Sequence, residues 1–423
     1  MSTGFTPPPH RLPIRLLNAG WGALAKAGIG RVSLEERSLV RAARRSARLD
    51  DLGADFDDPP IREARGRLLA ALEDEASLHP MGRAILRSTL VRSVVNRLRL
   101  EDLTKQHPEI AQIPVEAPVF IAGLPRTGTT LLHRLLTCEP TLRPLLSWEA
   151  LNPAPFPGKP ATGGRDPRMR LAETAERALR YMAPDFFAIH PVEAHDVEED
   201  VLLQDGSFMS PTVDATMPVP SYTAWLHATD QTPMYRYFRR LVQLLLWQKP
   251  GHYLGKTPHH LENLDVLLAV FPGARVIHTH RDPAKVVPSF CSMMAHGRRM
   301  FSDDVDPIAV GRQFHHKALD GVTRAMAARE TLPQESFIDV AYADLVADPM
   351  KQVRRIYDFL GLELSAETEE TMQGWRGANP QNKHGVHRYR LEDFGLDPEE
   401  LDRDFAAYRQ RFAIGLENGG ASS

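Results

Sequence analysis

The sequence has almost no cysteine, with only Cys138 and Cys291 among its 423 residues. Two cysteines cannot form a disulfide framework or, by themselves, a structural zinc site, so we expect a reduced, cytoplasmic setting. An excess of charge is also lacking, because 51 Lys and Arg residues stand against 54 Asp and Glu residues and leave a net charge of -3. This balance argues against a general binder of polyanions, and we expect no nucleic-acid partner.

Long apolar runs are missing as well. The longest early stretch, residues 16–25, is about half of the roughly 20 residues that a bilayer-crossing helix needs, so we expect no transmembrane span. The N-terminus does not resemble a secretory signal. The first fifty residues nevertheless carry nine Lys and Arg against three acidic residues. Residues 10–50 therefore either make peripheral contact with a membrane or a partner, or form a solvated basic face packed on the main domain.

The remaining composition is that of a globular protein, with 43% hydrophobic and 25% charged residues. Its length gives a prior of two to three domains. Proline is in excess, at 34 of 423 residues against a usual level of about 5%. We expect the excess to lie in irregular loops, above all in residues 152–165 and 205–220.

The N-terminal part and the rest of the chain have different patterns. From residue 60 to about 109 apolar side chains recur at spacings of three and four, which is the helical period. We therefore assign residues 1–115 to a helical N-terminal extension and residues 116–423 to a separate main domain.

Short apolar runs alternate with helical segments in the main domain. The runs cover residues 117–122, 274–280 and 335–341, and each has the character of a buried parallel strand. A helix is predicted over residues 349–360, with Gly361 as its cap. This alternation predicts an α/β fold in which helices flank a parallel sheet.

A loop between two glycines follows the first apolar run, with the sequence Gly123-Leu-Pro-Arg-Thr-Gly128-Thr-Thr. Its Gly-x4-Gly-x-Thr spacing is that of a P-loop, except that Thr129 replaces the lysine and Arg126 adds a cation inside the loop. Backbone N–H groups of such a loop, next to a helix N-terminus, form an anion site. The missing lysine weakens a kinase or ATPase interpretation.

This loop resembles the first signature of the sulfotransferases that use 3′-phosphoadenosine 5′-phosphosulfate (PAPS). The signature has the form Lys/Arg-Ser/Thr-Gly-Thr-Thr and stands here as Arg126, Thr127, Gly128, Thr129 and Thr130. The resemblance implies a P-loop-type fold, a loop that holds the phosphosulfate, and adenosine 3′,5′-bisphosphate (PAP) as the product. Oriented N–H groups and a guanidinium can stabilise the leaving phosphate, so we expect no metal.

Later segments resemble further parts of that family. Arg281 and Ser289 match an Arg-x7-Ser element that holds the 3′-phosphate, and both side chains suit a phosphate oxygen. Tyr342 matches a tyrosine near the adenine, although it is equally explained as a core residue. Lys383 and Arg388 lie where the family closes a basic loop over the cofactor.

Several residues are candidates for the base that takes the acceptor proton. In the tyrosylprotein branch, which the chain resembles more, the base is a glutamate matched by Glu149. In the cytosolic branch it is a histidine matched by His259 or His260, and Lys256 fits both branches as the cation beside the bridging oxygen. An acidic, histidine-rich stretch is the third choice; its members are His190, Glu193, His195, Glu198 and Glu199.

The predicted function is therefore sulfuryl transfer from PAPS to the hydroxyl of a small molecule by in-line displacement. A nucleotide-dependent kinase and a non-catalytic nucleotide-binding protein remain as alternatives. Residues 205–250 hold many aromatic and aliphatic side chains. These residues either roof a pocket for a lipid-like acceptor or form ordinary core.

Overall fold

The computed structural model describes residues 8–158, 165–379 and 389–417. Its centre is a parallel sheet with the strand order β2-β3-β1-β4-β5. The strands are Val119–Gly123 (β1), Leu142–Pro144 (β2), His252–Lys256 (β3), Arg275–His280 (β4) and Phe337–Ala341 (β5). The predicted α/β class is confirmed, and the three apolar runs correspond to β1, β4 and β5.

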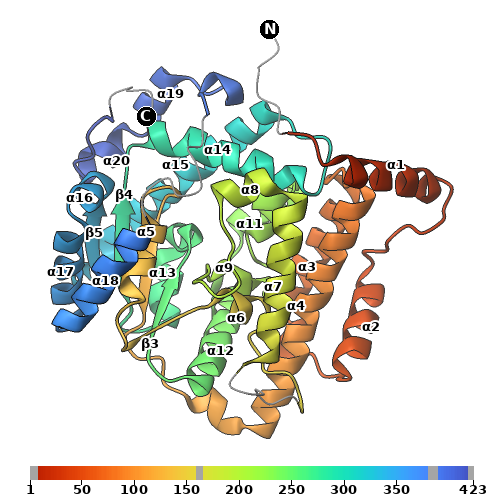
Figure 1. Ribbon diagram of the computed structural model, residues 1–423, viewed down its shortest axis with the longest axis horizontal. Coiled ribbons are helices and arrows are strands. Elements are labelled where there is room, and N and C mark those ends of the chain that lie inside the picture. Colours follow the sequence, from red (N-terminus) through yellow and green to blue (C-terminus); the bar gives the residue numbers. More distant parts are fainter. Residues whose placement is uncertain (1–7, 159–164, 380–388, 418–423) are drawn as a thin grey trace.

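Helices precede, connect and follow the strands (Figure 1). Before β1 lie α1 (Leu12–Lys26), α2 (Glu36–Ala47), η1 (Ala54–Asp57), α3 (Pro59–Asp74), α4 (Pro80–Gln106) and η2 (Pro108–Gln112). From β1 to β3 the chain forms α5 (Thr129–Leu136), α6 (Ser147–Leu151), α7 (Pro167–Met182), α8 (Pro184–Ile189), α9 (Val201–Gln204), η3 (Asp205–Ser207), α10 (Thr212–Thr216), α11 (Pro220–Ala228) and α12 (Thr232–Gln248). After β3 come η4 (Pro258–Asn263), α13 (Leu264–Val270), α14 (Pro283–Arg299), α15 (Pro307–Thr331), η5 (Gln334–Ser336), α16 (Tyr342–Ala347), α17 (Pro349–Leu360), α18 (Ala366–Ala378), η6 (Glu392–Phe394), α19 (Pro398–Asp404) and α20 (Ala406–Arg411).

Successive residues of β1 point to opposite faces of the sheet, and each face has its own hydrophobic core. On one face Ile121 belongs to a cluster with Leu132 of α5 and Val353 of α17. On the other face Phe120 packs on Phe238 of α12, with ring centroids 6.3 Å apart. The second cluster extends into α3 and α4, so the N-terminal helices share this core with the sheet domain. Figure 1 shows α5, α17 and α18 on one side of the sheet and α12, α4 and α3 on the other.

The carboxyl ends of the parallel strands meet at one edge of the sheet, where ligands usually bind in such folds. The segments identified in the sequence follow these ends directly. The phosphate loop follows β1, residues 257–260 follow β3, Arg281 follows β4, and Tyr342 follows β5. The topology therefore gathers segments from distant parts of the sequence.

Some local predictions were right and others were wrong. Helix α17 covers Pro349–Leu360 as predicted, and Gly361 ends it with a left-handed φ of 68°. The region 205–220 was expected to be a loop but contains η3 and α10. Strands β2 and β3 were missed, because β2 is only three residues long and β3 has polar residues at both ends.

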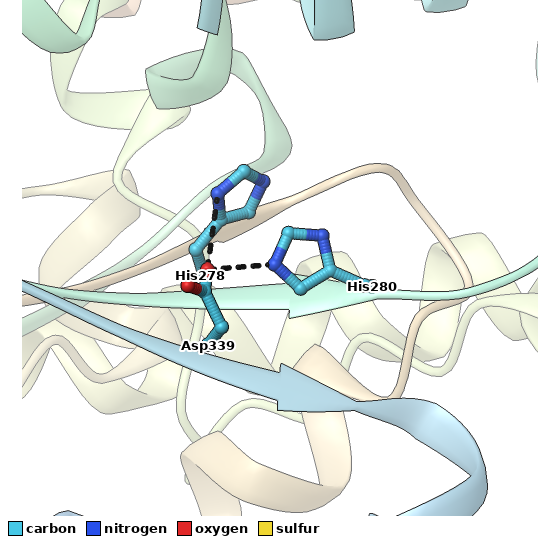
Figure 2. A group of neighbouring side chains, drawn as sticks. All are labelled: His278, His280 and Asp339. Atoms are coloured by element: carbon cyan, nitrogen blue, oxygen red, sulfur yellow. Dashed lines mark hydrogen bonds and ion pairs between the residues drawn. The ribbon is translucent and has the colours of Figure 1, made fainter. Parts of the chain in front are cut away.

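Three side chains of metal-ligand type lie together on β4 and β5, namely His278, His280 and Asp339 (Figure 2). Nε2 of His280 lies 2.8 Å from the Asp339 carboxylate. However, the guanidinium of Arg329 already donates to both oxygens of Asp339 and lies 3.4 Å from Nδ1 of His278. The positive charge that a metal would bring is thus supplied by Arg329, and the ring of Phe412 stacks on His280 at 4.1 Å. We interpret this cluster as a junction that fastens the C-terminal helices to the sheet.

Helix α1 carries an exposed apolar face. Of the nine large hydrophobic residues that are exposed in the described structure, five lie within residues 12–29, including Leu16 at 64% and Leu17 at 50%. In the described part of the chain no helix has both the length and the apolar character needed to cross a bilayer.

Candidate active site

A cavity of ≈ 1230 Å³ opens at the carboxyl edge of the sheet. Ligand pockets usually have about 300–1,000 Å³, so this one has room for a nucleotide and a second molecule. One part of its wall is the phosphate loop, with Arg126, Gly128, Thr129 and Thr130. Helices α3 and α4 form another part.

The phosphate loop has the backbone of an anion site. Arg126 and Gly128 both have left-handed φ angles, 67° and 87°, and Gly128 immediately precedes the first residue of α5. A Cβ atom on Gly128 would come within 2.8 Å of Leu345 and 3.1 Å of Tyr342, so glycine is needed for both space and conformation. Thr129 and Thr130, the first residues of α5, line the cavity, and the N–H groups at a helix start favour an anion.

Thr127 holds the loop from inside. Its hydroxyl is fully buried, donates to the carbonyl of Leu124 at 2.6 Å and lies 2.6 Å from the hydroxyl of Thr279 on β4. The Thr127 side chain does not line the cavity, in contrast to its neighbours. The prediction that it binds the cofactor is therefore corrected for the side chain: its hydroxyl braces the loop against β4.

Arg281 brings the two predicted signatures together. Its Nη1 donates to the backbone carbonyl of Arg126 at 3.0 Å, across 155 positions of sequence. Its guanidinium carbon also lies 3.9 Å from the ring centre of Tyr342. Tyr342 lines the cavity and is only half-buried, so the explanation of this residue as a core tyrosine does not hold.

The guanidinium of Arg281 is already bound to a carboxylate. Nε and Nη2 donate to the two oxygens of Glu417, at 2.8 and 2.9 Å. This bidentate pair raises the pKa of Arg281, although burial opposes the rise. A carboxylate offers a guanidinium fork the same geometry as a phosphate does, so Glu417 occupies an anion position beside the phosphate loop.

Two further cofactor predictions have different outcomes. Ser289 is 3% exposed on α14 and does not line the cavity, whereas Arg281 does, and the convergence of the two on one phosphate stays a prediction. Lys383 and Arg388 lie outside the described residues.

Lys256, the last residue of β3, is buried and does not itself line the cavity, but it forms an ion pair with Glu199, which does. Its Nζ lies 2.5 Å from Oε1 of that carboxylate. The ammonium group keeps the pKa of Glu199 at about 2 despite the burial that would raise it. The Glu199 side chain lines the cavity and is ionised at any ordinary pH.

Glu198 lies next to this pair but titrates very differently. Its carboxylate accepts from the N–H of Glu199 at 2.8 Å and from the hydroxyl of Ser147 at 3.2 Å. Burial raises its pKa to about 7, and the negative charge of Glu199 adds to the rise. Two adjacent carboxylates with widely separated pKa values are typical of acid–base sites.

A buried hydrogen-bond network fixes the segment that carries these two glutamates. The next residue, Asp200, is fully buried and accepts from Tyr253 at 2.6 Å, and it lies 3.1 Å from Nε2 of His260. The backbone of β3 passes so close that a Cβ atom on Gly255 would come within 2.2 Å of the Asp200 carboxylate. His260 also lies 3.0 Å from the hydroxyl of Tyr235 and is 0% exposed, so it is a core residue and cannot reach an acceptor.

His259 and His190 are the histidines of the candidate set that line the cavity. Nδ1 of His259 lies 3.3 Å from Glu262. Burial lowers the pKa of His190, although Glu199 opposes the effect. Glu193 and His195 do not line the cavity; they lie beside Arg180 and Glu173 of α7.

Glu149, predicted as the base, is not at the cavity. The guanidinium of Arg143 donates to both oxygens of its carboxylate, from Nη2 to Oε1 at 2.6 Å and from Nη1 to Oε2 at 2.8 Å. The N–H of Leu146 also donates to Oε2, at 3.2 Å. Both members of the ion pair are almost fully buried, and they line a different, smaller cavity with Trp148 and Arg168. We correct the prediction: Glu149 caps α6, and its sequence distance from Arg126 does not bring it to the phosphate loop.

The aromatic stripe of residues 222–247 is mostly core, and its rings do not line the large cavity. The first part of the region 205–250 does line the cavity, with Phe208 and Met217 among its side chains. The rest of the apolar wall includes Leu86 and Leu90 of α4 and Met293 and Met294 of α14. Sequence reasoning placed α4 outside the functional domain and therefore missed its contribution.

Two more groups of pocket residues were missed. Arg134 follows Thr130 by one helical turn on α5, and both line the cavity, so an i, i+4 spacing could have identified it. Gln373, Trp375 and Arg376 of α18 also line the cavity, but no sequence pattern distinguishes them.

Comparisons with known proteins agree with this geometry. The profile of a family described as "Sulfotransferase family" matches residues 118–366. The omega-hydroxy-beta-dihydromenaquinone-9 sulfotransferase Stf3 of Mycobacterium bovis and that of Mycobacterium tuberculosis are each 31% identical over 260 residues, which are 58% of this chain and 63% of the relative. The match thus spans less than two thirds of these relatives.

Two solved structures are similar over most of the chain. Sulfotransferase STF9 from Mycobacterium avium has a TM-score of 0.82 at 30% identity and covers 91% of this chain and 98% of its own. Sulfotransferase STF1 from M. tuberculosis H37Rv has a TM-score of 0.77 at 33% identity, with 89% and 99% covered. Both similarities extend well beyond residues 118–366.

Proposed function

Because the chain belongs to the sulfotransferase family, we propose that it transfers the sulfuryl group of PAPS to the hydroxyl of an apolar, lipid-like acceptor. One observation carries the proposal. Arg281 contacts both the phosphate loop and Tyr342, so the segments that resemble the two PAPS signatures meet at one end of the cavity. The size of the cavity leaves room for an acceptor next to the nucleotide.

The residues present fit this co-substrate. Loop N–H groups at Gly128, Thr129 and Thr130, with Arg126, would hold the phosphosulfate. Arg281 would hold the 3′-phosphate in place of Glu417, and the ring of Tyr342 would lie against the adenine. When bound, PAPS supplies an activated sulfuryl group and a phosphate leaving group.

Lys256 would neutralise the charge that develops on the bridging oxygen as the S–O bond breaks. Its present partner, Glu199, lines the cavity and lies 2.5 Å from the ammonium group. A compact ammonium suits this task because it can follow a moving charge.

Glu198 would take the proton from the acceptor hydroxyl. A general base works best when its pKa is near the working pH, and the pKa of Glu198 is about 7, whereas that of Glu199 is about 2. His259 remains the second choice, because it lines the same cavity. Whichever group acts, the proton moves from the hydroxyl to the base as the acceptor oxygen bonds to sulfur.

The acceptor is proposed from the cavity wall and from the relatives. Leucine, phenylalanine and methionine side chains are frequent among the residues that line the cavity. The curated relatives are named for an omega-hydroxylated menaquinone derivative. We therefore expect a long alcohol or phenol rather than a sugar or a protein tyrosine.

The exposed face of α1 supports peripheral contact with a membrane, from which such an acceptor would come. Leu12, Leu16 and Leu17 are at least half exposed, and Arg11 and Arg15 stand among them in sequence. Apolar side chains beside cations favour the interface of an anionic bilayer.

Calorimetry with PAP tests the cofactor site without any knowledge of the acceptor. We expect Arg126→Ala and Arg281→Ala to weaken PAP binding by about tenfold or more, since each removes a charged contact to phosphate. Arg354→Ala, which removes an exposed arginine of α17, serves as the control. Unchanged affinity in both test variants would refute the site.

Transfer of labelled sulfate from PAPS to a panel of long-chain alcohols tests the reaction. Reactions with ATP and Mg²⁺ in place of PAPS provide the contrast with a kinase. Transfer from ATP and none from PAPS would overturn the proposal.

A further inference from the structure

A polar patch lies in the wall of the cavity, among side chains that are otherwise apolar. It consists of Arg92 on α4, Asp205 at the start of η3, and the hydroxyls of Ser210 and Thr212, all of which line the cavity. The two hydroxyls are 2.8 Å apart, and both stand beside the Asp205 carboxyl. Charged side chains are rare in an apolar wall unless something pairs with them.

Neither charge is fully matched within the described residues. The Arg92 side chain has no hydrogen bond or ion pair there, and Asp205 acts on it through its charge alone. Oδ1 of Asp205 is buried without a hydrogen-bond partner. Burial raises the pKa of Asp205 to about 6. A guanidinium and a carboxyl oxygen thus both have free hydrogen-bonding capacity at one place in the cavity.

The patch and the transferring end are formed by different elements. Arg92 belongs to α4 and Asp205 to η3, whereas the phosphate loop leads into α5, and in the view of Figure 1 α8 and α9 are drawn between α4 and α5. Met217, Phe290 and Met294 are among the apolar residues of the same cavity. A molecule whose hydroxyl reaches the phosphate loop would therefore place an apolar body along this wall and its other end near Arg92.

We infer that Arg92 and Asp205 recognise a second polar group of the acceptor, at the end opposite to the hydroxyl that receives the sulfuryl group. The inference rests on the proposed function and specifies its substrate class. The group is uncharged, because Asp205 repels an anion and Arg92 repels a cation. It accepts a hydrogen bond from Arg92 and donates one to Asp205, as a hydroxyl does. The acceptor is then polar at both ends and apolar between them.

The test compares α,ω-alkanediols with 1-alkanols of equal chain length as acceptors of labelled sulfate from PAPS. In the wild-type protein we expect kcat/KM for the diol that spans the cavity to exceed that of the matched alcohol by about tenfold, since the extra hydrogen bonds involve charged groups. Because a diol has two equivalent reactive hydroxyls, its kcat/KM is first divided by two. Arg92→Met and Asp205→Asn should each abolish the preference and leave kcat/KM for the 1-alkanol nearly unchanged.

Arg99→Met is the matched control. Arg99 lies on the same helix, does not line the cavity and stacks on Phe156 at 4.5 Å. It should retain the wild-type preference for the diol. Equal wild-type rates for diols and alcohols at every length would overturn the inference, and so would a preference that persists in both Arg92→Met and Asp205→Asn.

Failure of the inference can be distinguished from failure of the proposed function. Turnover of 1-alkanols with PAPS supports the function whatever the diols do. If neither class is sulfated, calorimetric binding of diols and alkanols to the PAP-loaded wild-type protein decides the inference by itself, and equal affinities refute it. This comparison in the wild-type protein also decides the matter if the variants do not fold.

Discussion

Replacement of Glu417 by glutamine should strengthen the binding of PAP. Glu417 holds both arms of the Arg281 guanidinium that we assign to the 3′-phosphate. A bound nucleotide must displace this carboxylate before it can use Arg281. Glu417→Gln keeps the shape of the side chain, removes its charge, and so lowers the free energy needed for the exchange.

The expected size of the effect follows from the exposure of the pair. A bidentate, charge-assisted pair is strong when it is buried. However, the side chains of Arg281 and Glu417 are 19% and 34% exposed, so water and salt screen much of the attraction. We take about 1 kcal/mol for the pair, which corresponds to roughly a fivefold lower Kd for PAP.

Titration calorimetry at low and high salt measures this change. The gain should shrink as ionic strength rises, because salt screens the lost charge. Glu63→Gln removes a carboxylate from another exposed ion pair, with Arg67 on α3, and should leave the Kd unchanged. In an Arg281→Ala background Glu417→Gln should give no gain. Equal Kd values for the wild-type protein and Glu417→Gln, together with a weakened Arg281→Ala, would refute competition between Glu417 and the phosphate.

Three further results are expected. The value of kcat/KM should fall as pH falls through about 7, because Glu198 must be ionised to accept a proton. Glu198→Gln should lower kcat by about 10²–10⁴ and remove this acidic limb of the pH–rate profile. Glu149→Gln should lower the melting temperature and keep the acidic limb, and the opposite pattern would reinstate Glu149 as the base. Lys256→Met should reduce kcat by about 10²–10³, measured by initial rates, and weaken PAP binding much less, measured by calorimetry. Equal losses in kcat and in PAP affinity would argue against a role of Lys256 in the transition state. Leu16→Glu should reduce cosedimentation with anionic lipid vesicles, whereas Leu171→Glu, at an exposed leucine of α7, should not, and equal behaviour of the two would rule out α1 as the contact.

The fold class could be predicted from the sequence because the central strands are buried on both faces. Burial on both sides favours apolar residues, so β1 and the start of β4, Val276 and Ile277, are visible as a run, although β4 also buries His278, Thr279 and His280. Strand β3 escaped notice for the opposite reason. It starts at the exposed His252, and it ends in Gly255 and Lys256, which the approach of Asp200 and the pairing with Glu199 require.

The cofactor end of the site was easier to predict than the proton acceptor. Phosphate binding depends on a local backbone shape, and this shape is determined by consecutive residues, Gly128 and the threonines after it. It is therefore visible as a short sequence motif. The position of a base depends instead on the path of the chain between elements. Glu149 forms an ion pair with Arg143, whereas Glu198 lies at the cavity because the hydrogen bond from Tyr253 to Asp200 fixes its segment. The number of residues between each glutamate and the phosphate loop predicts neither position.

The division of the cavity wall between two parts of the chain has a consequence for altering the enzyme. Residues of α3 and α4, including Leu68, Leu86 and Leu90, line the cavity but precede the segment that matches the family profile. Mutations there can reshape the acceptor end without disturbing Arg126, Lys256 or Arg281. A directed-evolution library confined to these two helices could therefore search for new acceptors while every member keeps the same sulfuryl donor.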